Sequence, residues 1–136
     1  MVAYVYNYIK RRFMMFQQWK PFNFEISFEE WLIVFKLTGD ADSVTTDSIF
    51  EKIMAETSLF NKIVLDMADL AYCNSRFLWQ LFSLADSLEK KMGKVCIRKC
   101  NQAIIETLTI VWMFDVIPMC ETVAEARQYL TNHKEG

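Results

Sequence analysis

Hydrophobic and polar positions follow each other in blocks along this chain, and the period within each block indicates a strand or a helix. The clearest block runs from Lys62 to Phe82. It opens with a dense apolar run at residues 63–65, which is typical of a buried strand. After polar residues 74–76, apolar side chains recur at helical spacing, at Phe77, Leu78, Leu81, Phe82, Ala85 and Leu88. The block predicts a buried strand that leads directly into a helix, with the polar residues at the carboxyl end of the strand.

Two strands and a helix are expected before this central block. Residues 23–37 alternate between apolar and polar positions and then become densely apolar, so we predict two short strands with a turn near residues 29–30. The sequence Gly-Asp-Ala-Asp at residues 39–42 is expected to break the chain. Three polar residues are candidates to cap the helix that follows: Asp42, Ser43 and Thr45. The predicted buried face of that helix consists of Ile49, Phe50, Ile53 and Met54.

Two further strands and two further helices are expected after the central block. Gly93 lies where a helix end commonly takes a left-handed residue, and residues 94–98 form the next apolar strand. Asn101 is a suitable cap for a short helix. A last strand is predicted near residues 114–117, before a C-terminal helix that starts at residue 121 or 122. The order β-β-α-β-α-β-α-β-α predicts an α/β fold with a mostly parallel sheet of four to five strands.

The first twenty residues differ from the rest of the chain, because they carry basic side chains and no acid. Their tyrosines alternate as in a strand, but the i, i+4 spacing of Val2, Val5, Ile9, Phe13 and Phe16 favours a helix that ends at Pro21. We therefore divide the chain into an N-terminal amphipathic extension, residues 1–22, and a domain, residues 23–136. The apolar stripe is expected to form a homodimer with a second copy, and peripheral membrane contact is the alternative.

Composition and charge exclude several classes of function. The 136 residues suffice for one domain, and the chain lacks an apolar run of the ~20 residues that span a bilayer. A net charge of -2, with basic and acidic residues interleaved beyond the N-terminal segment, argues against nucleic-acid binding. Four cysteines without a signal-peptide pattern indicate free thiols in a cytoplasmic protein. The sequence therefore favours a cytoplasmic protein that binds other proteins.

Catalytic and cofactor motifs are missing from the sequence. The single histidine is His133, near the end of the chain, so a serine or cysteine nucleophile has no evident base. The three glycines are too far apart for a phosphate-binding loop. Cys96 and Cys100 have the spacing of metal ligands but no second ligand pair nearby. We expect no enzyme activity, no cofactor and no metal.

The polar turn of the central block resembles the motif of the STAS domain family. In that family a buried strand ends in hydrophobic-Asp-Ser-Ser-Gly-Leu-Gly, and the first serine accepts a phosphate from a partner kinase. Here the stretch Leu-Ala-Tyr-Cys-Asn-Ser-Arg-Phe-Leu-Trp is in register with it. The match places Asn74 at the aspartate, Ser75 at the phosphoacceptor, Arg76 at the second serine, and Phe77 and Trp79 at the two glycines.

Two other stretches support the resemblance. Gly39 and Asp42 occupy the fixed places of the turn that precedes the first helix in this family. The chain also closes on Pro-x-x-Glu-Thr-hydrophobic-x-Glu-Ala, from Pro118 to Ala126. The resemblance covers residues 24–130 and implies a sheet with its helices mainly on one face.

The resemblance implies a non-enzymatic interaction module of the anti-sigma factor antagonist type. Its expected partner is an anti-sigma factor or a kinase-like protein, and phosphorylation of Ser75 is the expected switch. The loop and helix around Ser75 would bind this partner through Asp42, Asn74, Ser75, Arg76, Phe77 and Trp79, and Arg76 would help to hold the phosphate. The alternative is a structural subunit or adaptor of a membrane transporter or membrane surface, in which Ser75 is only a helix cap.

Overall fold

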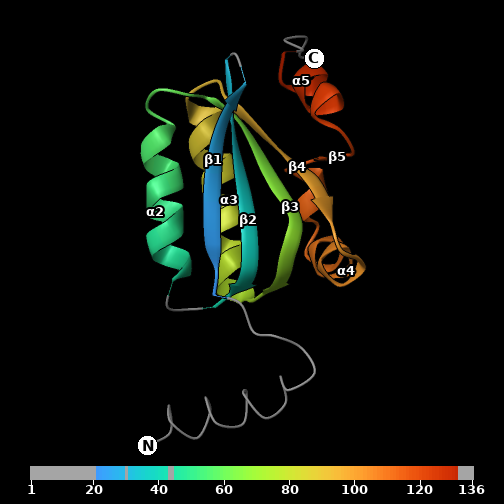
Figure 1. Ribbon diagram of the computed structural model, residues 1–136. Coiled ribbons are helices and arrows are strands. Elements are labelled where there is room, and N and C mark those ends of the chain that lie inside the picture. Colours follow the sequence, from blue (N-terminus) through green and yellow to red (C-terminus); the bar gives the residue numbers. More distant parts are fainter. Residues whose placement is uncertain (1–20, 30, 43–44, 132–136) are drawn as a thin grey trace, which may run out of the picture.

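The computed structural model describes residues 21–29, 31–42 and 45–131, and these residues form a five-stranded sheet with helices on both faces (Figure 1). The strands lie side by side in chain order. They are β1 (Asn23–Glu29), β2 (Leu32–Ala41), β3 (Lys62–Cys73), β4 (Lys94–Cys100) and β5 (Met119–Cys120). Strand β1 runs antiparallel to β2, and the remaining neighbours are parallel. The predicted order of elements and the mostly parallel sheet are confirmed.

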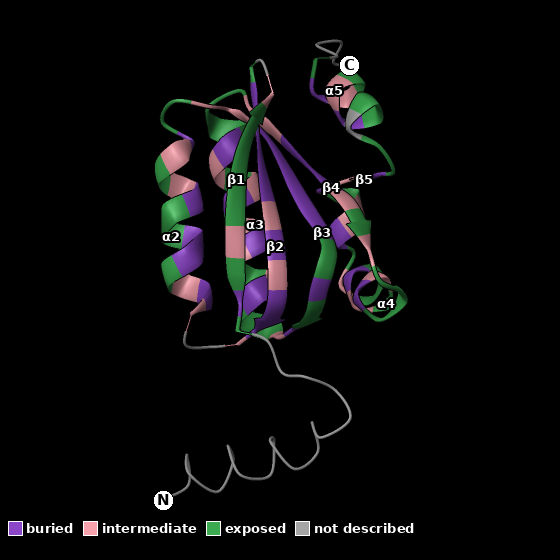
Figure 2. Cartoon of the chain, viewed as in Figure 1, coloured by how far each residue is buried: buried purple, intermediate pink, exposed green. Residues whose placement is uncertain are grey.

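Most of the helices pack on one face of the sheet. They are α2 (Thr46–Glu56), α3 (Ser75–Lys90) and α4 (Gln102–Ile110), whereas α5 (Val123–Thr131) packs on the other face. The two faces follow from the alternation of side chains along the strands: Ile63 and Leu65 point to the larger core, and Val64 points to the smaller one under α5. Figure 2 shows β2 and β3 as largely buried and β1 as largely exposed.

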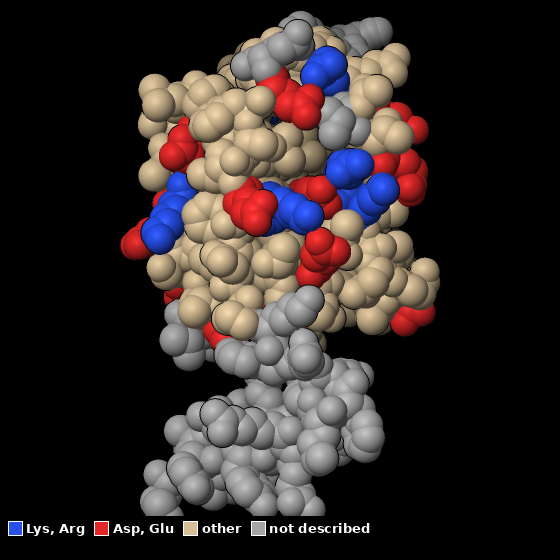
Figure 3. Space-filling model, in the orientation of Figure 1, with Lys and Arg blue, Asp and Glu red and all other residues tan. Residues whose placement is uncertain are grey.

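The face under α5 is only partly apolar. A row of alternating charges crosses the strands, because Glu25 pairs in register with Lys36, Lys36 with Asp66, and Asp66 with Arg98. Arg98 donates to the Asp66 carboxylate at 2.8 Å. Figure 3 shows a band of blue and red atoms across the middle of the molecule. The opposite charges on neighbouring strands reinforce the register of the sheet.

Helix α3 buries one continuous stripe against the sheet. Its buried residues are Phe77, Leu81, Leu84 and Leu88, at the spacing of a core-facing helix. At the end of α3, Met92 takes the left-handed conformation with a φ of 60°, whereas Gly93 does not. The prediction of a left-handed Gly93 is therefore wrong. A Cβ on Gly93 would lie 2.4 Å from the carbonyl oxygen of Asn61, so glycine is needed for the close approach of two turns.

Two other local predictions are wrong. Residues 39–42 were expected to break the chain, but β2 continues to Ala41, and Gly39 accommodates the irregular register there with a φ of 87°. The strand predicted near residues 114–117 is absent. Residues 113–115 form a 3-10 turn, because Met113 and Ile117 point to the core with a helix-like spacing, and the short β5 follows it.

The cap predicted at Asn101 is confirmed. Its side chain accepts a hydrogen bond from the Ile104 amide at 2.9 Å and donates one to the Leu70 carbonyl at 3.0 Å, so it also ties α4 to β3. The helix predicted over residues 1–20 and the end of the chain after residue 131 lie outside the described residues. Phe22, which we assigned to the extension, is buried in the core. Among the described helices, none is long and apolar enough to cross a bilayer.

Candidate functional site

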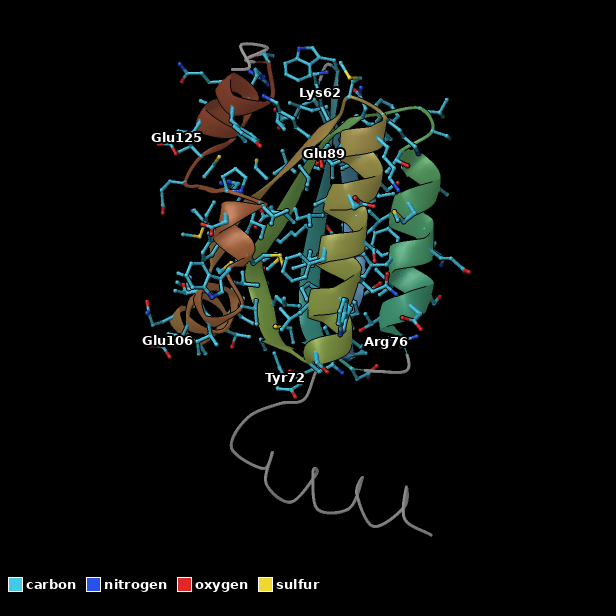
Figure 4. All side chains as sticks on the ribbon, turned by 180° about the vertical axis from the view of Figure 1, so that it is seen from behind. Lys62, Tyr72, Arg76, Glu89, Glu106 and Glu125 are labelled. Atoms are coloured by element: carbon cyan, nitrogen blue, oxygen red, sulfur yellow. The ribbon has the colours of Figure 1, made fainter. Side chains whose placement is uncertain are left out.

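The predicted site residues gather at the carboxyl end of the parallel strands. Ala41 at the end of β2 pairs with Cys73 at the end of β3, so the two strands end side by side. Asp42 follows the first strand, and Asn74 follows the second. Figure 4 shows Tyr72 and Arg76 at this end of the molecule, with Lys62 at the opposite end. The topology thus brings together residues that lie about thirty positions apart in the sequence.

Asn74, and not Ser75, caps helix α3. The Asn74 side chain accepts a hydrogen bond from the Phe77 amide at 3.0 Å, and its backbone is extended, as a cap requires. Ser75 is the first residue of the helix and is exposed. The expectation that Ser75 itself caps the helix is therefore wrong, because Asn74 has that role.

Asp42 has a comparable local role at the start of the neighbouring helix. Its carboxylate accepts hydrogen bonds from the Thr45 amide at 2.9 Å and from the Thr45 hydroxyl at 3.0 Å. These bonds satisfy one donor near the helix N-terminus. Asp42 therefore acts by holding Thr45 at the start of α2.

Arg76 is held by helix α2. Its guanidinium makes a two-pronged contact with Asp47, with Nε 2.9 Å from Oδ1 and Nη2 2.6 Å from Oδ2. Gln80 donates a third hydrogen bond to the same carboxylate at 2.7 Å. The hydrogen bonds from Arg76 and then Gln80 lower the pKa of Asp47, and the pair raises the pKa of Arg76. A phosphate on Ser75 would have to compete with Asp47 for this arginine.

Phe77 and Trp79 have opposite environments. Phe77 is 0% exposed and packs edge-on against Phe22, with ring centroids 5.9 Å apart, and against Phe50 at 5.3 Å. The expectation that Phe77 contributes to a partner-binding surface is wrong, because this position of the helix faces the core. Trp79 is 70% exposed. Of the two aromatic residues at the family's glycine positions, only Trp79 is accessible to a partner.

An apolar pocket opens beside Ser75. It has a volume of about 230 Å³ and is lined by Ser75, Leu78, Trp79, Phe82 and Val111. Trp112, the residue after Val111, is 72% exposed and adds a second indole at the end of α4. We call Trp79, Trp112 and the residues lining this pocket the Ser75 surface. Exposed aromatic side chains around a small apolar hollow are typical of protein-binding surfaces.

Cys73, next to the site, is an unreactive thiol. Burial raises the pKa of the Cys73 thiol to about 11, so almost none of it is thiolate near neutral pH. Within residues 21–29, 31–42 and 45–131, no group of three or more His, Cys, Asp or Glu side chains is placed to hold a metal ion. The chemistry available at the site is that of an exposed hydroxyl and an apolar hollow.

The sequence from residue 23 to residue 126 matches the STAS domain family. The chain belongs to this family. A STAS fold also explains the element order described above, in which one antiparallel strand precedes a parallel sheet. A comparison with curated protein sequences finds no match.

Solved structures of anti-sigma factor antagonists share the fold of this STAS domain. One from Mycobacterium paratuberculosis has a TM-score of 0.71 at 19% identity, over 83% of this chain and 98% of that one. The anti-sigma factor antagonist SpoIIAA in its unphosphorylated form has a TM-score of 0.69 at 15% identity, over 79% and 95%. A putative anti-sigma factor antagonist from Thermotoga maritima has a TM-score of 0.71 at 15% identity, over 79% and 93%. At these identities the likeness concerns the fold.

Several residues of the site in this STAS domain could not be found from the sequence. Gln80 of α3 donates a hydrogen bond to Asp47 of α2. No short sequence motif indicates that these two helices lie side by side. Leu78 and Phe82 are half-buried: they pack against the larger core and also line the pocket. Val111 reaches the pocket from the end of α4. Only tertiary packing brings these side chains to Ser75.

Proposed function

We propose that this STAS protein is a cytoplasmic, non-enzymatic interaction module that binds an anti-sigma factor or a kinase-like protein through the Ser75 surface, and that phosphorylation of Ser75 controls this binding. The observation that carries the proposal is the exposed Ser75 hydroxyl at the rim of an apolar pocket. Family membership supports a protein partner. SpoIIAA, which has the same fold, is known in unphosphorylated and phosphorylated forms.

The position of Ser75 explains how a phosphate would act. Phosphorylation adds about 1.5–2 negative charges at neutral pH. At the first residue of a helix, that charge is favoured by the helix dipole, so the modification leaves α3 folded. The same charge lies at the rim of a hollow lined by Leu78, Phe82 and Val111. A partner that inserts an apolar side chain there would have to desolvate the phosphate, and its affinity falls.

Arg76 sets the local electrostatics of this switch. In the unmodified chain its charge is balanced by Asp47, and Gln80 supports the carboxylate. A phosphate on Ser75 would offer Arg76 a second anionic partner on the same helix. Because the Arg76–Asp47 pair is exposed, exchanging one anion for the other costs little. Phosphorylation would then loosen the link between α2 and α3 at the edge of the Ser75 surface.

Binding experiments with four variants of the full chain test the proposal. Proteins captured by the wild type are identified by mass spectrometry, and the recovered partner is titrated against Ser75→Asp, Ser75→Ala and Trp79→Ala. Ser83→Asp is the matched control, because Ser83 is exposed on the same helix and does not line the pocket. We expect Ser75→Asp and Trp79→Ala to weaken binding about tenfold or more, as for central interface residues, and Ser75→Ala and Ser83→Asp to bind like the wild type.

The outcome also separates the proposed switch from a fixed adaptor. Equal affinity of Ser75→Asp and the wild type would remove phosphorylation as the control. Capture of a transporter ATPase whose binding depends on Trp79 but not on the charge at Ser75 would identify a structural subunit. Unchanged binding by Trp79→Ala would contradict the assignment of the Ser75 surface itself.

A further inference from the structure

Strand β1 forms an open edge of the sheet among the described residues. It is the outermost strand, it pairs with β2 in an unbroken register over seven residues, and its outer side has no neighbour in the described sheet. Exposed edges are usually blocked by charged side chains, above all lysine, by proline or by a β-bulge. Residues 23–29 contain no lysine, proline or bulge, and their only charges are Glu25 and Glu29. On the helix side of the strand, Ile26 is 39% exposed and Phe28 is 57% exposed. Such an edge is a template for another strand.

The sequence of β1 is self-complementary about Ile26. In an antiparallel pair of two copies centred there, Ile26 lies opposite Ile26, and Phe24 lies opposite Phe28. These side chains share one face of the sheet, since Phe24 contacts Phe35 and Phe28 contacts Phe60 in the larger core. The pairing would therefore join two short apolar rows into one continuous strip, which shields part of Ile26 and Phe28 from water.

The polar face of β1 fits the same register. Glu25 would lie opposite Ser27, and Asn23 opposite Glu29, so no two carboxylates face each other directly. Glu29 is also paired with Arg127 of its own chain at 3.1 Å. A shift of the centre to Ser27 would instead place Glu25 directly opposite Glu29, where like charges repel. The charges thus select the register that is centred on Ile26.

The backbone directions agree with this register. A two-residue hairpin connection is closed by a hydrogen-bonded residue pair, and such pairs alternate along the ladder. Glu29 and Leu32 are the last registered pair of this ladder. If they form a hydrogen-bonded closing pair, the alternation would direct the N–H and C=O groups of Phe24, Ile26 and Phe28 to the outer edge. These are the residues that the self-complementary register brings opposite each other.

We propose that two copies of this chain associate by antiparallel pairing of their β1 edges about Ile26, which forms one continuous ten-stranded sheet. The inference is independent of the proposed function, because β1 contributes no residue to the Ser75 surface. It also differs from a dimer formed by residues 1–20. A second copy is the occupant that the pattern favours, since the same strand supplies both complementary halves.

A charge series at Ser27 tests the register in the full chain. Ser27 is exposed, and the symmetric dimer would contain two pairs in which Ser27 of one copy lies opposite Glu25 of the other. Ser27→Lys should tighten the dimer and Ser27→Glu should weaken it, each by roughly two- to thirtyfold in dissociation constant, from two cross-strand charge pairs. Adding Glu25→Gln to Ser27→Glu should restore the wild-type value, because it removes the like charge. Sedimentation equilibrium measures the constants, and thermal melting of each variant checks that it is folded.

Three results would overturn the pairing. One is a wild-type chain that stays monomeric at every concentration that sedimentation reaches. Another is a dimer whose dissociation constant is the same for Ser27→Lys and Ser27→Glu, which would move the interface elsewhere, including to residues 1–20. The third is a failure of Glu25→Gln to rescue a folded Ser27→Glu variant. Opposite shifts with rescue support the β1 pairing, since only that register opposes these two positions.

Discussion

Replacing Asn74 with alanine removes the side-chain acceptor that closes the first turn of α3. In the folded chain, Asn74 Oδ1 lies 3.0 Å from the Phe77 amide nitrogen. Alanine leaves the backbone path open to the helix but offers no acceptor, so this amide loses its partner in a half-buried turn. Because Phe77 is itself a core residue, fraying of this turn disturbs the contact between the helix and the sheet.

The expected loss is about 1 kcal/mol of unfolding free energy, within a range of roughly 0.5–2 kcal/mol for N-cap removal. In a chain of this size that corresponds to a fall of about 3–5 °C in Tm. Ser75→Ala is the matched control, because Ser75 is exposed and does not cap the helix. Its unfolding free energy should stay within about 0.5 kcal/mol of the wild type. Urea denaturation followed by circular dichroism measures both variants under the same conditions.

Equal losses in the two variants would refute this reasoning, and so would a larger loss in Ser75→Ala. Either result would mean that the Ser75 hydroxyl also helps to cap the helix. The assignment of the cap to Asn74 alone would then be wrong. The stability measurement therefore has to precede the binding comparison. Only if Ser75→Ala is as stable as the wild type does its affinity report on the surface alone.

Three further predictions concern packing, pH and thiol reactivity. Gly93→Ala should cost about 1–3 kcal/mol in urea denaturation, because its Cβ would lie 2.4 Å from the Asn61 carbonyl oxygen; an unchanged midpoint would contradict the close approach. The pair with Arg76 lowers the pKa of Asp47, so its stabilisation is present above the ordinary value of 3.8 and is lost as the pH falls below it. Asp47→Asn should remove that part of the acid sensitivity, and an unaltered pH profile would argue against the pair. Burial raises the pKa of Cys73 to about 11, so iodoacetamide at pH 8 should label it much more slowly in the folded chain than in urea, as peptide mass spectrometry can show.

The parts of the fold that depend on local periodicity could be predicted from the sequence. The dense apolar run at residues 63–65 and the helical spacing after residue 76 fix β3 and α3, because the run lies in the buried first half of β3 and one face of α3 is buried along the helix. The cap at Asn101 follows from a side chain that hydrogen-bonds within its own turn. These features need no knowledge of distant residues.

The errors arose where tertiary contacts decide the conformation. Gly93 is required by the carbonyl of Asn61 thirty-two residues earlier, and not by its own φ. The apolar residues near 114–117 fill the core from a 3-10 turn, although their composition also suits a strand. Phe77 follows Ser75 closely in sequence, yet the helix turns it inward while Trp79 is turned outward. The pocket beside Ser75 was invisible in the sequence because Val111 reaches it from another helix.

The separation of the two cores by the sheet gives the chain two cooperative units of unequal strength. Among the described helices, only α5 covers the smaller core, and the strand before it, β5, pairs with β4 over only two residues. Detaching α5 and β5 together exposes Ala126, Leu130 and Cys120 and removes Met119 from the larger core, but the buried residues of that core all lie in other parts of the chain. Hydrogen exchange in α5 then occurs by local opening, whereas exchange in the centre of β3 requires global unfolding. We therefore expect limited proteolysis to cut in α5 before it cuts in the other described helices.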